Sequence, residues 1–211
     1  MSATDRRTRF VSFDAEGTLA THAFSRTVWR EAVPALYARK YGVSLDEASE
    51  RVFAEYESIG SGRRELYSIG YWFERFGLGS PLPVIEELRS SIEFYPEVPT
   101  VLESLSGRFT LVVSSSTPIE FLRPLLRDVQ RYFLRVFSAT SEHGRLKDEE
   151  FFRWLCRELD AEPSEVVHVG DSREHDMVGP SGAGIVAYHL DRKGTANGSL
   201  GNLLDLLPLL E

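Results

Sequence analysis

Four acidic residues in two short segments have the types and spacing that suit a divalent cation. Asp14 and Glu16 follow the apolar run 9–13, and Asp171 and Asp176 lie shortly after a second apolar run. Hard cations such as Mg²⁺ prefer oxygen ligands and typically take one or two carboxylates together with a substrate phosphate. A carboxylate at the end of a strand can also act as a nucleophile. Each acid taken alone is equally compatible with a turn or a helix cap.

Two further segments supply groups that can hold an anion. Ser114 ends the predicted strand 109–113 and Ser115 follows it, so hydroxyls and backbone N–H groups there suit a phosphate oxygen. Lys147 precedes the predicted helix 149–159, where an ammonium can neutralise an anionic group as a compact charge. Only three of the 24 basic residues are lysines, which favours a specific use of this one.

The order of the predicted elements explains how these residues would meet. The first strand is predicted at 9–13, and after residue 95 further strands alternate with helices. Such alternation predicts an α/β fold, a doubly wound, Rossmann-like parallel sheet with helices on both faces. Ligands bind these sheets beyond the carboxyl ends of the strands, where Asp14, Ser114 and Asp171 would lie. The later strands are predicted at 109–113, 134–137, 166–169 and 184–188, with helices at 100–105, 118–126, 149–159 and 203–210.

Residues 20–94 follow a different pattern, because their apolar residues recur at helical spacing. Pro34 predicts a kink or a division of the first helix. Ser44 with Glu47 three positions later fits a capping box at the start of the second. We therefore predict a core domain formed by 1–19 and 95–211 and an inserted helical domain at 20–94. The inserted helices are predicted at 24–41, 45–60, 65–76 and 84–94.

Charge and composition narrow the classes of protein to consider. The 24 basic and 32 acidic residues give a net charge of −8, which disfavours binding to nucleic acid. No apolar run approaches the ~20 residues of a membrane-spanning helix. Asp14 and Glu16 interrupt the first hydrophobic stretch, which argues against a signal peptide. A single Cys156 allows no internal disulfide, so we expect a cytoplasmic protein that does not bind membranes.

Taken in order, these segments resemble the motifs of the haloacid dehalogenase (HAD) superfamily, whose members are largely Mg²⁺-dependent phosphatases. The family's Asp-x-Asp-x-Thr motif is similar to residues 14–18, except that Glu16 stands at its third position. A strand that ends in Ser or Thr matches 111–114, and a lysine before a helix matches Lys147. The fourth motif matches Gly170-Asp171-Ser172 followed by Asp176, and the insertion 20–94 lies where the family has an α-helical C1 cap.

The resemblance implies a role for each matching residue. Asp14 would attack phosphorus, while Ser114 and Lys147 would hold the transferring phosphoryl group. Mg²⁺ would be bound by the Asp14 carboxylate, the backbone carbonyl of Glu16 and Asp171, with Asp176 supporting the site. Thr18 and Ser115 are further candidates for substrate binding. The implied substrate is a small phosphorylated metabolite, and the implied protein is a monomer or a homodimer.

Glu16 departs from the family pattern, because phosphatases of this family use an Asp there as general acid and base. Glu has the same chemistry but is one methylene longer, and a general acid must lie within about 2.6–3.2 Å of its proton partner. Two alternatives stay open: a haloacid dehalogenase, which also has a non-Asp residue there, and a catalytically weak HAD-like phosphate-binding protein. A phosphonate hydrolase would need a cap lysine, and Lys40 is the single lysine in the predicted cap.

The predicted cap offers candidates for substrate recognition. Arg63 and Arg64 follow a glycine-rich loop between cap helices and could bind a second anionic group, or be solvated charges beside Glu65. Two histidines, His22 near the start of the insertion and His175 between the late acids, could also reach the substrate or the metal's water shell. The cap aromatics Tyr67, Tyr71, Trp72 and Phe73 are predicted to be core.

Overall fold

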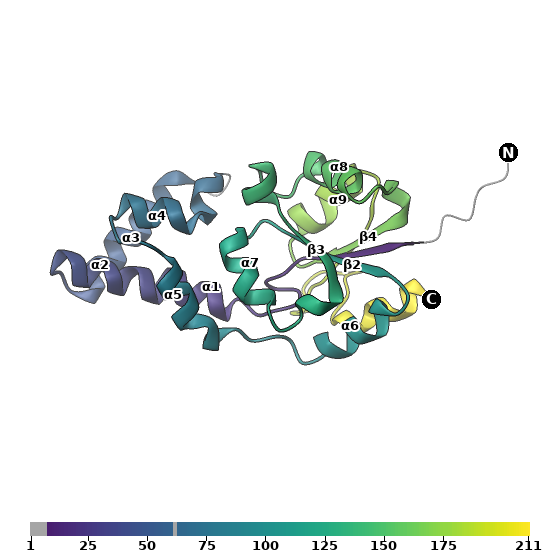
Figure 1. Ribbon diagram of the computed structural model, residues 1–211, viewed down its shortest axis with the longest axis horizontal. Helices are drawn as coiled ribbons and strands as arrows, with labels where there is room; N and C mark the ends of the chain where they lie inside the picture. Colours follow the sequence, from purple (N-terminus) through teal and green to yellow (C-terminus); the bar gives the residue numbers. More distant parts are fainter. Residues whose placement is uncertain (1–7, 61–62) are drawn as a thin grey trace.

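Five parallel strands form one sheet in the computed structural model, which describes residues 8–60 and 63–211. The strand order among the described residues is β3-β2-β1-β4-β5. This order confirms the predicted α/β, Rossmann-like core, with the first strand at the centre (Figure 1). The strands are β1 (Phe10–Phe13), β2 (Thr110–Ser115), β3 (Phe133–Ser138), β4 (Val166–Gly170) and β5 (Val186–His189).

Helices cover both faces of the sheet, as the alternation predicted (Figure 1). Because side chains alternate along a strand, Phe10 contributes to one core cluster and Val11 to the other. The Phe10 side is covered by α8 (Glu149–Glu158) and α9 (Gly179–Gly182). The opposite side is covered by α6 (Val98–Ser106), α7 (Ile119–Leu126) and the C-terminal 3-10 helix Leu203–Leu210.

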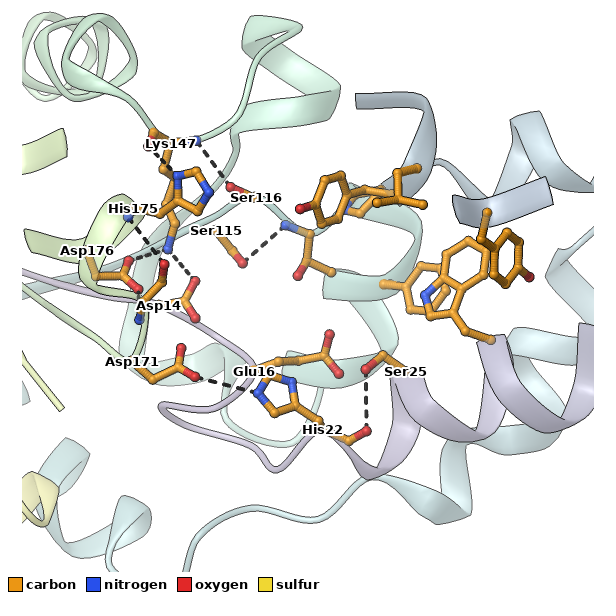
Figure 2. Close-up of a pocket in the computed structure, with 18 of the residues that line it drawn as sticks. Asp14, Glu16, His22, Ser25, Ser115, Ser116, Lys147, Asp171, His175 and Asp176 are labelled. Carbon is orange, nitrogen blue, oxygen red and sulfur yellow. Dashed lines mark hydrogen bonds and ion pairs between the residues drawn. The ribbon is translucent and has the colours of Figure 1, made fainter. Parts of the chain in front are cut away.

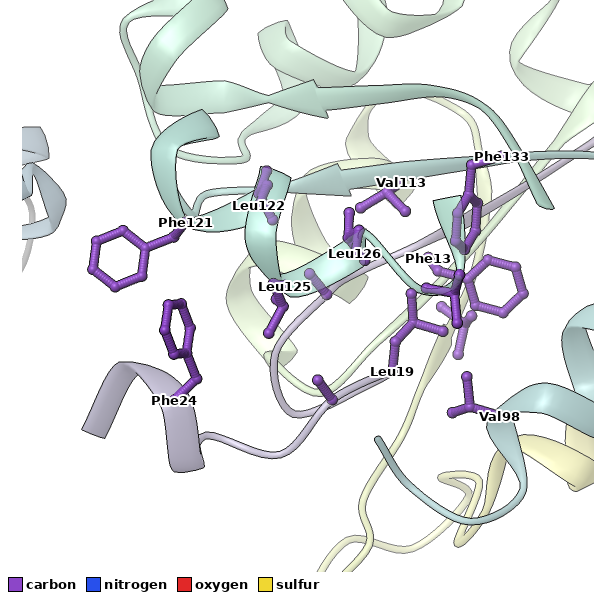
Figure 3. Packing of buried hydrophobic residues seen from close by; sticks show 14 of the residues in the cluster. Phe13, Leu19, Phe24, Val98, Val113, Phe121, Leu122, Leu125, Leu126 and Phe133 are labelled. Carbon is purple, nitrogen blue, oxygen red and sulfur yellow. The ribbon is translucent and has the colours of Figure 1, made fainter. Parts of the chain in front are cut away.

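The larger core cluster joins this second face of the sheet to the insertion. Phe13 and Val113 from the strands pack with Leu122 and Leu126 of α7 (Figure 3). Burying each such side chain stabilises the fold by about 1.5–3 kcal/mol. Beyond the sheet the cluster continues through Phe24 of the insertion, so the helical part and the sheet share apolar contacts.

Helices joined by turns and loops make up the insertion 20–94 between β1 and β2, and its described residues form isolated bridges but no strand. Its elements are α1 (Ala23–Thr27), a π-helical segment (Val28–Ala32), α2 (Val33–Tyr41), α3 (Leu45–Ile59), a 3-10 turn (Arg64–Tyr67), α4 (Ile69–Arg75), α5 (Leu82–Glu87) and a 3-10 turn (Leu88–Ser91). This arrangement is consistent with the C1 cap that the sequence resemblance implied, and we call residues 20–94 the cap.

Local signals in the cap sequence account for its helix boundaries. Pro34 was expected to kink or divide the first helix. The structure instead passes at Val33 from a π-helical segment into α2 with no break in the helical backbone, and Pro34 lies in the first turn of α2. Ser44 caps α3 and accepts a hydrogen bond from the Glu47 N–H at 3.2 Å. The predicted helix 65–76 is instead divided at Ser68, whose hydroxyl caps α4.

The two chain segments that connect cap and core run side by side. The Thr21 N–H donates to the Glu93 carbonyl at 2.8 Å, and the Tyr95 N–H donates to the Leu19 carbonyl at 3.0 Å. The predicted boundaries at 19/20 and 94/95 fall in this pair of connections, and the division into two domains stays a prediction. An aromatic contact also joins cap and core, because Trp29 of the cap stacks on Phe121 of α7 with ring centroids 5.6 Å apart.

None of the described helices combines the length and the apolar character that crossing a membrane would require. Cys156 lies buried on α8 as a free thiol.

Candidate active site

The carboxyl ends of β1, β2 and β4 meet at one edge of the sheet, where the cap faces the core. Asp14 follows β1, Ser115 ends β2 and Asp171 follows β4. All three line a cavity of about 600 Å³ whose opposite wall comes from the cap (Figure 2). The strand ends therefore bring together residues that are far apart in the sequence, as expected for ligand sites in such sheets.

Three aspartates form a compact cluster of oxygen ligands in the described part of the chain. Carboxylate oxygens of Asp14, Asp171 and Asp176 all lie within 4.8 Å of one another. The backbone leaves room for them at Gly17, which has φ +84° and where a Cβ would overlap the Asp171 carboxylate. A Cβ added at Gly170 would likewise overlap the Asp176 carboxylate. Closely set carboxylates are the donors that a hard cation such as Mg²⁺ prefers, so this cluster fits the implied metal.

Lys147 connects two members of the aspartate cluster. Its Nζ lies 2.5 Å from Asp14 Oδ1 and also donates to Asp176 Oδ1. The lysine side chain is only 3% exposed. Although burial disfavours its charge, Asp14 and Asp176 raise the pKa of Lys147. The cluster therefore contains a charged ammonium, which offsets part of the repulsion among the acids and toward an incoming anion.

The two carboxylates that Lys147 contacts differ in their affinity for protons. Burial raises the pKa of Asp14 to about 7, and Asp176 and Asp171 act in the same direction against Lys147. Burial also favours the neutral form of Asp176, but Lys147 and His168 hold its pKa well below the usual range. Of these two carboxylates, Asp14 is thus the one that takes up a proton near neutral pH in the metal-free protein.

The raised pKa of Asp14 predicts a pH-dependent metal affinity. A cation that binds Asp14 must displace its proton, so the apparent affinity for Mg²⁺ should fall by up to about tenfold per pH unit below pH 7. The folded protein also binds the Asp14 proton more tightly than the unfolded chain does. Without metal, the contribution of Asp14 to the free energy of unfolding therefore declines as pH rises from 3.8 toward 7. Calorimetric titration with Mg²⁺ at several pH values measures the effect, and an affinity that stays constant across this range contradicts it.

A buried chain of hydrogen bonds lies beneath the cluster and includes Ser114. Ser12 Oγ and Ser114 Oγ lie 2.6 Å apart, and His168 Nδ1 lies 3.0 Å from Ser12 Oγ. His168 Nε2 is 2.8 Å from Asp176 Oδ1. Burial lowers the pKa of His168, so a neutral ring that donates to Asp176 and accepts from a serine satisfies both of its nitrogens.

This arrangement corrects the prediction that Ser114 faces the substrate. Ser114 is completely buried and points toward Ser12 and His168, whereas the next residue, Ser115, lines the cavity. Side chains alternate along β2, so a one-residue shift in the assigned strand end exchanges the two faces. The strand was predicted to end at residue 113 and in fact continues to Ser115.

His168 is expected to stabilise the fold through this buried chain. In His168→Leu, Asp176 loses a hydrogen-bond partner and the two serines lose an acceptor, which should lower the free energy of unfolding by about 1–3 kcal/mol. Urea denaturation measures the loss, and His168→Gln, which keeps a donor and an acceptor, should recover part of it. Equal stability of His168→Leu and the wild type would refute this role.

Glu16 lies at the cavity but outside the aspartate cluster. Its side chain lines the cavity beside Ser25 of the cap (Figure 2). Its Oε1 is buried and has no hydrogen-bond partner among the described residues. Burial raises the pKa of Glu16, an effect that Ser25 and His22 reduce. The Glu16 carboxyl is therefore easier to protonate than an exposed glutamate, and its buried Oε1 is unpaired among the described residues.

Two histidines that the sequence only suggested also border the cavity. His22 Nε2 lies 3.6 Å from Asp171 Oδ2, and this contact raises the pKa of His22. His175 Nδ1 lies 3.0 Å from the Lys147 carbonyl oxygen. The Lys147 N–H donates to Ser116 Oγ at 3.1 Å. Ser116 and His175 therefore hold the backbone of Lys147 from two sides. No sequence motif assigned either residue to this position.

The loop that carries Asp14 and Glu16 is held by an arginine that sequence reasoning missed. Arg192, in the loop after β5, donates to the Gly17 carbonyl at 3.2 Å and to the Thr18 carbonyl at 2.8 Å. Its guanidinium also contacts Glu97. The contacts are to backbone oxygens, which explains why no sequence pattern pointed to this residue.

The remaining predicted substrate-binding residues are not among the described residues that line the cavity. Thr18 is fully buried and is not among the described residues that line it. Arg63 pairs with Glu65 at 3.2 Å, and neither Arg63 nor Arg64 belongs to the described lining. A Cβ added at Gly144 would lie 3.3 Å from Arg64 Nη1, so this arginine instead extends toward the core at that residue.

Comparisons with known proteins identify the family to which this chain belongs. Residues 8–184 match the family described as haloacid dehalogenase-like hydrolase. A segment of 68 residues is 34% identical to the GMP/IMP nucleotidase YrfG of Escherichia coli (strain K12), a match that covers 32% of this chain and 30% of that protein.

Solved structures agree with the family match. A HAD phosphatase from Thermococcus onnurineus has a TM-score of 0.85 and 25% identity, covering 96% of this chain and 98% of that one. A 2-haloacid dehalogenase from Pseudomonas syringae pv. Tomato DC3000 has a TM-score of 0.67 and 24% identity, with coverage of 96% and 98%. With a family match across most of its length and a cap inserted after β1, the chain belongs to the haloacid dehalogenase-like hydrolases.

Proposed function

We propose that this protein hydrolyses small phosphate monoesters with the help of Mg²⁺. The observation that carries the proposal is the cluster of Asp14, Asp171 and Asp176, bridged by Lys147 at one end of a cavity. The cation would be held by Asp14, the backbone carbonyl of Glu16 and Asp171, with Asp176 supporting the site. Bound there, Mg²⁺ would supply positive charge against the phosphate oxygens.

The proposed chemistry proceeds in two displacements at phosphorus. In the first, a carboxylate oxygen of Asp14 bonds to phosphorus, the ester P–O bond breaks, and Glu16 gives its proton to the leaving oxygen. In the second, Glu16 takes a proton from water as the water oxygen bonds to phosphorus, and the bond to Asp14 breaks to release phosphate. Such transfers depend mainly on positioning and charge neutralisation.

Lys147 and Ser115 are the proposed partners of the transferring phosphoryl group. Lys147 already contacts Asp14 and so lies next to the position that the phosphoryl group would take. Ser115 takes the role that the sequence assigned to Ser114, because its side chain is the one that lines the cavity. Its hydroxyl accepts a hydrogen bond from the Thr117 N–H at 3.2 Å, which fixes its orientation.

The names of the relatives support a phosphatase over other hydrolases of the family. The curated relative is a nucleotidase and the structure with a TM-score of 0.85 is a phosphatase. The solved dehalogenase shows that the same fold also serves the runner-up reaction. Three aspartates within 4.8 Å of one another favour the metal-dependent reaction, because a dehalogenase in this family generally needs no Mg²⁺.

A panel of phosphorylated metabolites, assayed for phosphate release with and without Mg²⁺, tests the proposal. We expect release that depends on Mg²⁺ and disappears on chelation. Mg²⁺-independent release of chloride from a 2-haloacid would establish the dehalogenase instead. Metal-dependent phosphate binding without turnover of any ester would establish the phosphate-binding protein.

Glu16→Ala should lower turnover of any accepted ester at least about tenfold, because general acid–base catalysis typically contributes 10²–10⁴-fold. The effect should fall on kcat and be smaller for esters with good leaving groups, which need less protonation. The matched control is Glu50→Ala, which removes an exposed cap carboxylate that is not among the residues described as lining the cavity. Unchanged turnover of Glu16→Ala would remove this residue from the mechanism.

A further inference from the structure

The two loops that carry the proposed Mg²⁺ ligands are both attached to a third segment of the chain. His189, the last residue of β5, and Arg192, three positions later, each hydrogen-bond to the backbone of one of these loops. Among the described residues, no hydrogen bond directly joins residues 15–18 of the first loop to residues 171–176 of the second. The segment at the end of β5 therefore provides a hydrogen-bonded link between them.

Arg192 holds the first loop through two consecutive carbonyls. Its guanidinium donates to the Gly17 carbonyl at 3.2 Å and to the Thr18 carbonyl at 2.8 Å. Gly17 is also the residue that lies against the Asp171 carboxylate, which a Cβ at this position would overlap. Arg192 thus fixes the peptide units directly after the Glu16 carbonyl and sets how closely this loop approaches Asp171.

The guanidinium of Arg192 is itself anchored where the cap joins the core. Its Nη1 lies 2.6 Å from Glu97 Oε1, and the side chains of Arg192 and Glu97 are only 17% and 8% exposed. Its central carbon lies 3.4 Å from the centre of the Tyr95 ring, so the cation also stacks on an aromatic face. An arginine has five donors in a rigid fork, so one side chain can serve a carboxylate and two carbonyls together.

His189 holds the second loop in a similar way. A carbonyl oxygen can only accept, so His189 Nε2 donates to the Asp171 carbonyl, which lies 3.0 Å away. The other ring nitrogen, Nδ1, lies 2.7 Å from Ser199 Oγ, which fixes the orientation of the ring. The loop that begins at His189 is closed at its base, because the Leu200 N–H donates to the His189 carbonyl at 2.8 Å. The support on which both acid loops rest is therefore internally hydrogen-bonded.

We propose that His189 and Arg192 are positioning residues for Mg²⁺, which together set the separation between the loop of Asp14 and the loop of Asp171. This inference rests on the metal site of the proposed function. Neither residue belongs to the described lining of the cavity, so each acts through the backbone of a ligand-bearing loop. Mg²⁺ demands near-ideal octahedral geometry with oxygens at about 2.0–2.1 Å, so a small shift between the loops weakens its binding.

Calorimetric titration with Mg²⁺ tests the proposal in the absence of any ester. Arg192→Met and His189→Leu should each weaken Mg²⁺ binding about tenfold, the lower end of the loss that follows removal of groups supporting metal ligands. Two milder variants guard against a failure to fold. His189→Gln keeps a donor for the Asp171 carbonyl and should recover part of the affinity. Arg192→Lys keeps the charge but not the fork of donors, and should bind Mg²⁺ with an affinity between those of Arg192→Met and the wild type.

Arg108→Met is the matched control, because it removes the same kind of contact far from the acids. Arg108 precedes β2 at the opposite edge of the sheet and donates to the Leu210 carbonyl at 2.6 Å. This variant should lower stability toward urea but leave the affinity for Mg²⁺ unchanged. An equal loss of Mg²⁺ affinity in Arg108→Met and Arg192→Met would overturn the proposal, since the loss would then follow stability.

Hydrogen exchange of the metal-free protein measures the positioning itself. Within the first loop the Leu19 N–H donates to the Ala15 carbonyl at 2.8 Å. Arg192→Met should therefore speed amide exchange in the peptide 14–21, and Arg108→Met should not. Unchanged exchange there, or wild-type Mg²⁺ affinity in both Arg192→Met and His189→Leu, would overturn the inference and leave the proposed function standing. Mg²⁺ binding that both variants weaken, without phosphate release from any ester, would support the inference and end the phosphatase proposal.

Discussion

Asp14→Asn is expected to abolish ester hydrolysis, with a loss of kcat of at least about 10³-fold. An amide oxygen is a poor nucleophile toward phosphorus, and covalent catalysis requires the activated carboxylate. The size and shape of Asn match those of Asp, and its oxygen can still accept the hydrogen bond from Lys147. The fold should therefore persist, and circular dichroism and thermal unfolding check that it does.

Asp128→Asn is the matched control for this variant, because Asp128 is exposed and lies outside the cavity. It should keep the wild-type rate. Asp14→Asn should also bind Mg²⁺ more weakly, since one of three closely set carboxylates loses its charge. Retention of more than about a tenth of wild-type kcat in Asp14→Asn would exclude nucleophilic attack by this residue, given the contribution expected of a nucleophile.

Lys147→Met should have the second largest effect, lowering kcat by about 10²–10³-fold. Removal of one preorganised charge at a transition state usually has an effect of this size. The substitution also leaves Asp14 and Asp176 facing each other without the ammonium that now separates them. Breaking a buried ion pair in this way destabilises a fold by about 3–5 kcal/mol. Both kcat and urea denaturation should therefore respond.

A variant of a second, exposed lysine serves as the control for this result. Lys193→Met removes an exposed lysine and should change neither the rate nor the stability. Mg²⁺ at saturating concentration should restore part of the lost stability of Lys147→Met, because the cation takes over the neutralisation of the aspartates. A Lys147→Met enzyme with wild-type kcat would show that the phosphoryl group does not meet this side chain.

Much of the fold was predictable from the sequence because its signals are local and consistent. Apolar strands that end in polar residues alternate with amphipathic helices, and this pattern leaves few arrangements other than a parallel sheet. Ser44 marked the start of α3 through capping chemistry that acts within a few residues. The predicted end of β2 at residue 113 was wrong, because serines often begin a loop but here continue the strand to Ser115.

The parts of the site that escaped prediction depend on contacts between distant segments. Ser114 and Ser115 have the same side chain, and only the register of β2 in the sheet determines which of them faces the cavity. Arg192 acts through backbone carbonyls, which any sequence provides. Phe53 and Tyr56 of the cap have the helical spacing of an ordinary core face. That they line the cavity follows from how the cap sits on the sheet.

The nucleophilic role of Asp14 is the central claim, and trapping the phosphorylated enzyme tests it most directly. The enzyme is mixed with an accepted ester and Mg²⁺, quenched in acid within the first turnover, and analysed by peptide mass spectrometry. We predict one phosphoryl group on the peptide that contains Asp14, formed before free phosphate appears and absent from Asp14→Asn. Release of phosphate by the wild type with no phosphoryl group on Asp14 at any time in the first turnover would contradict the account.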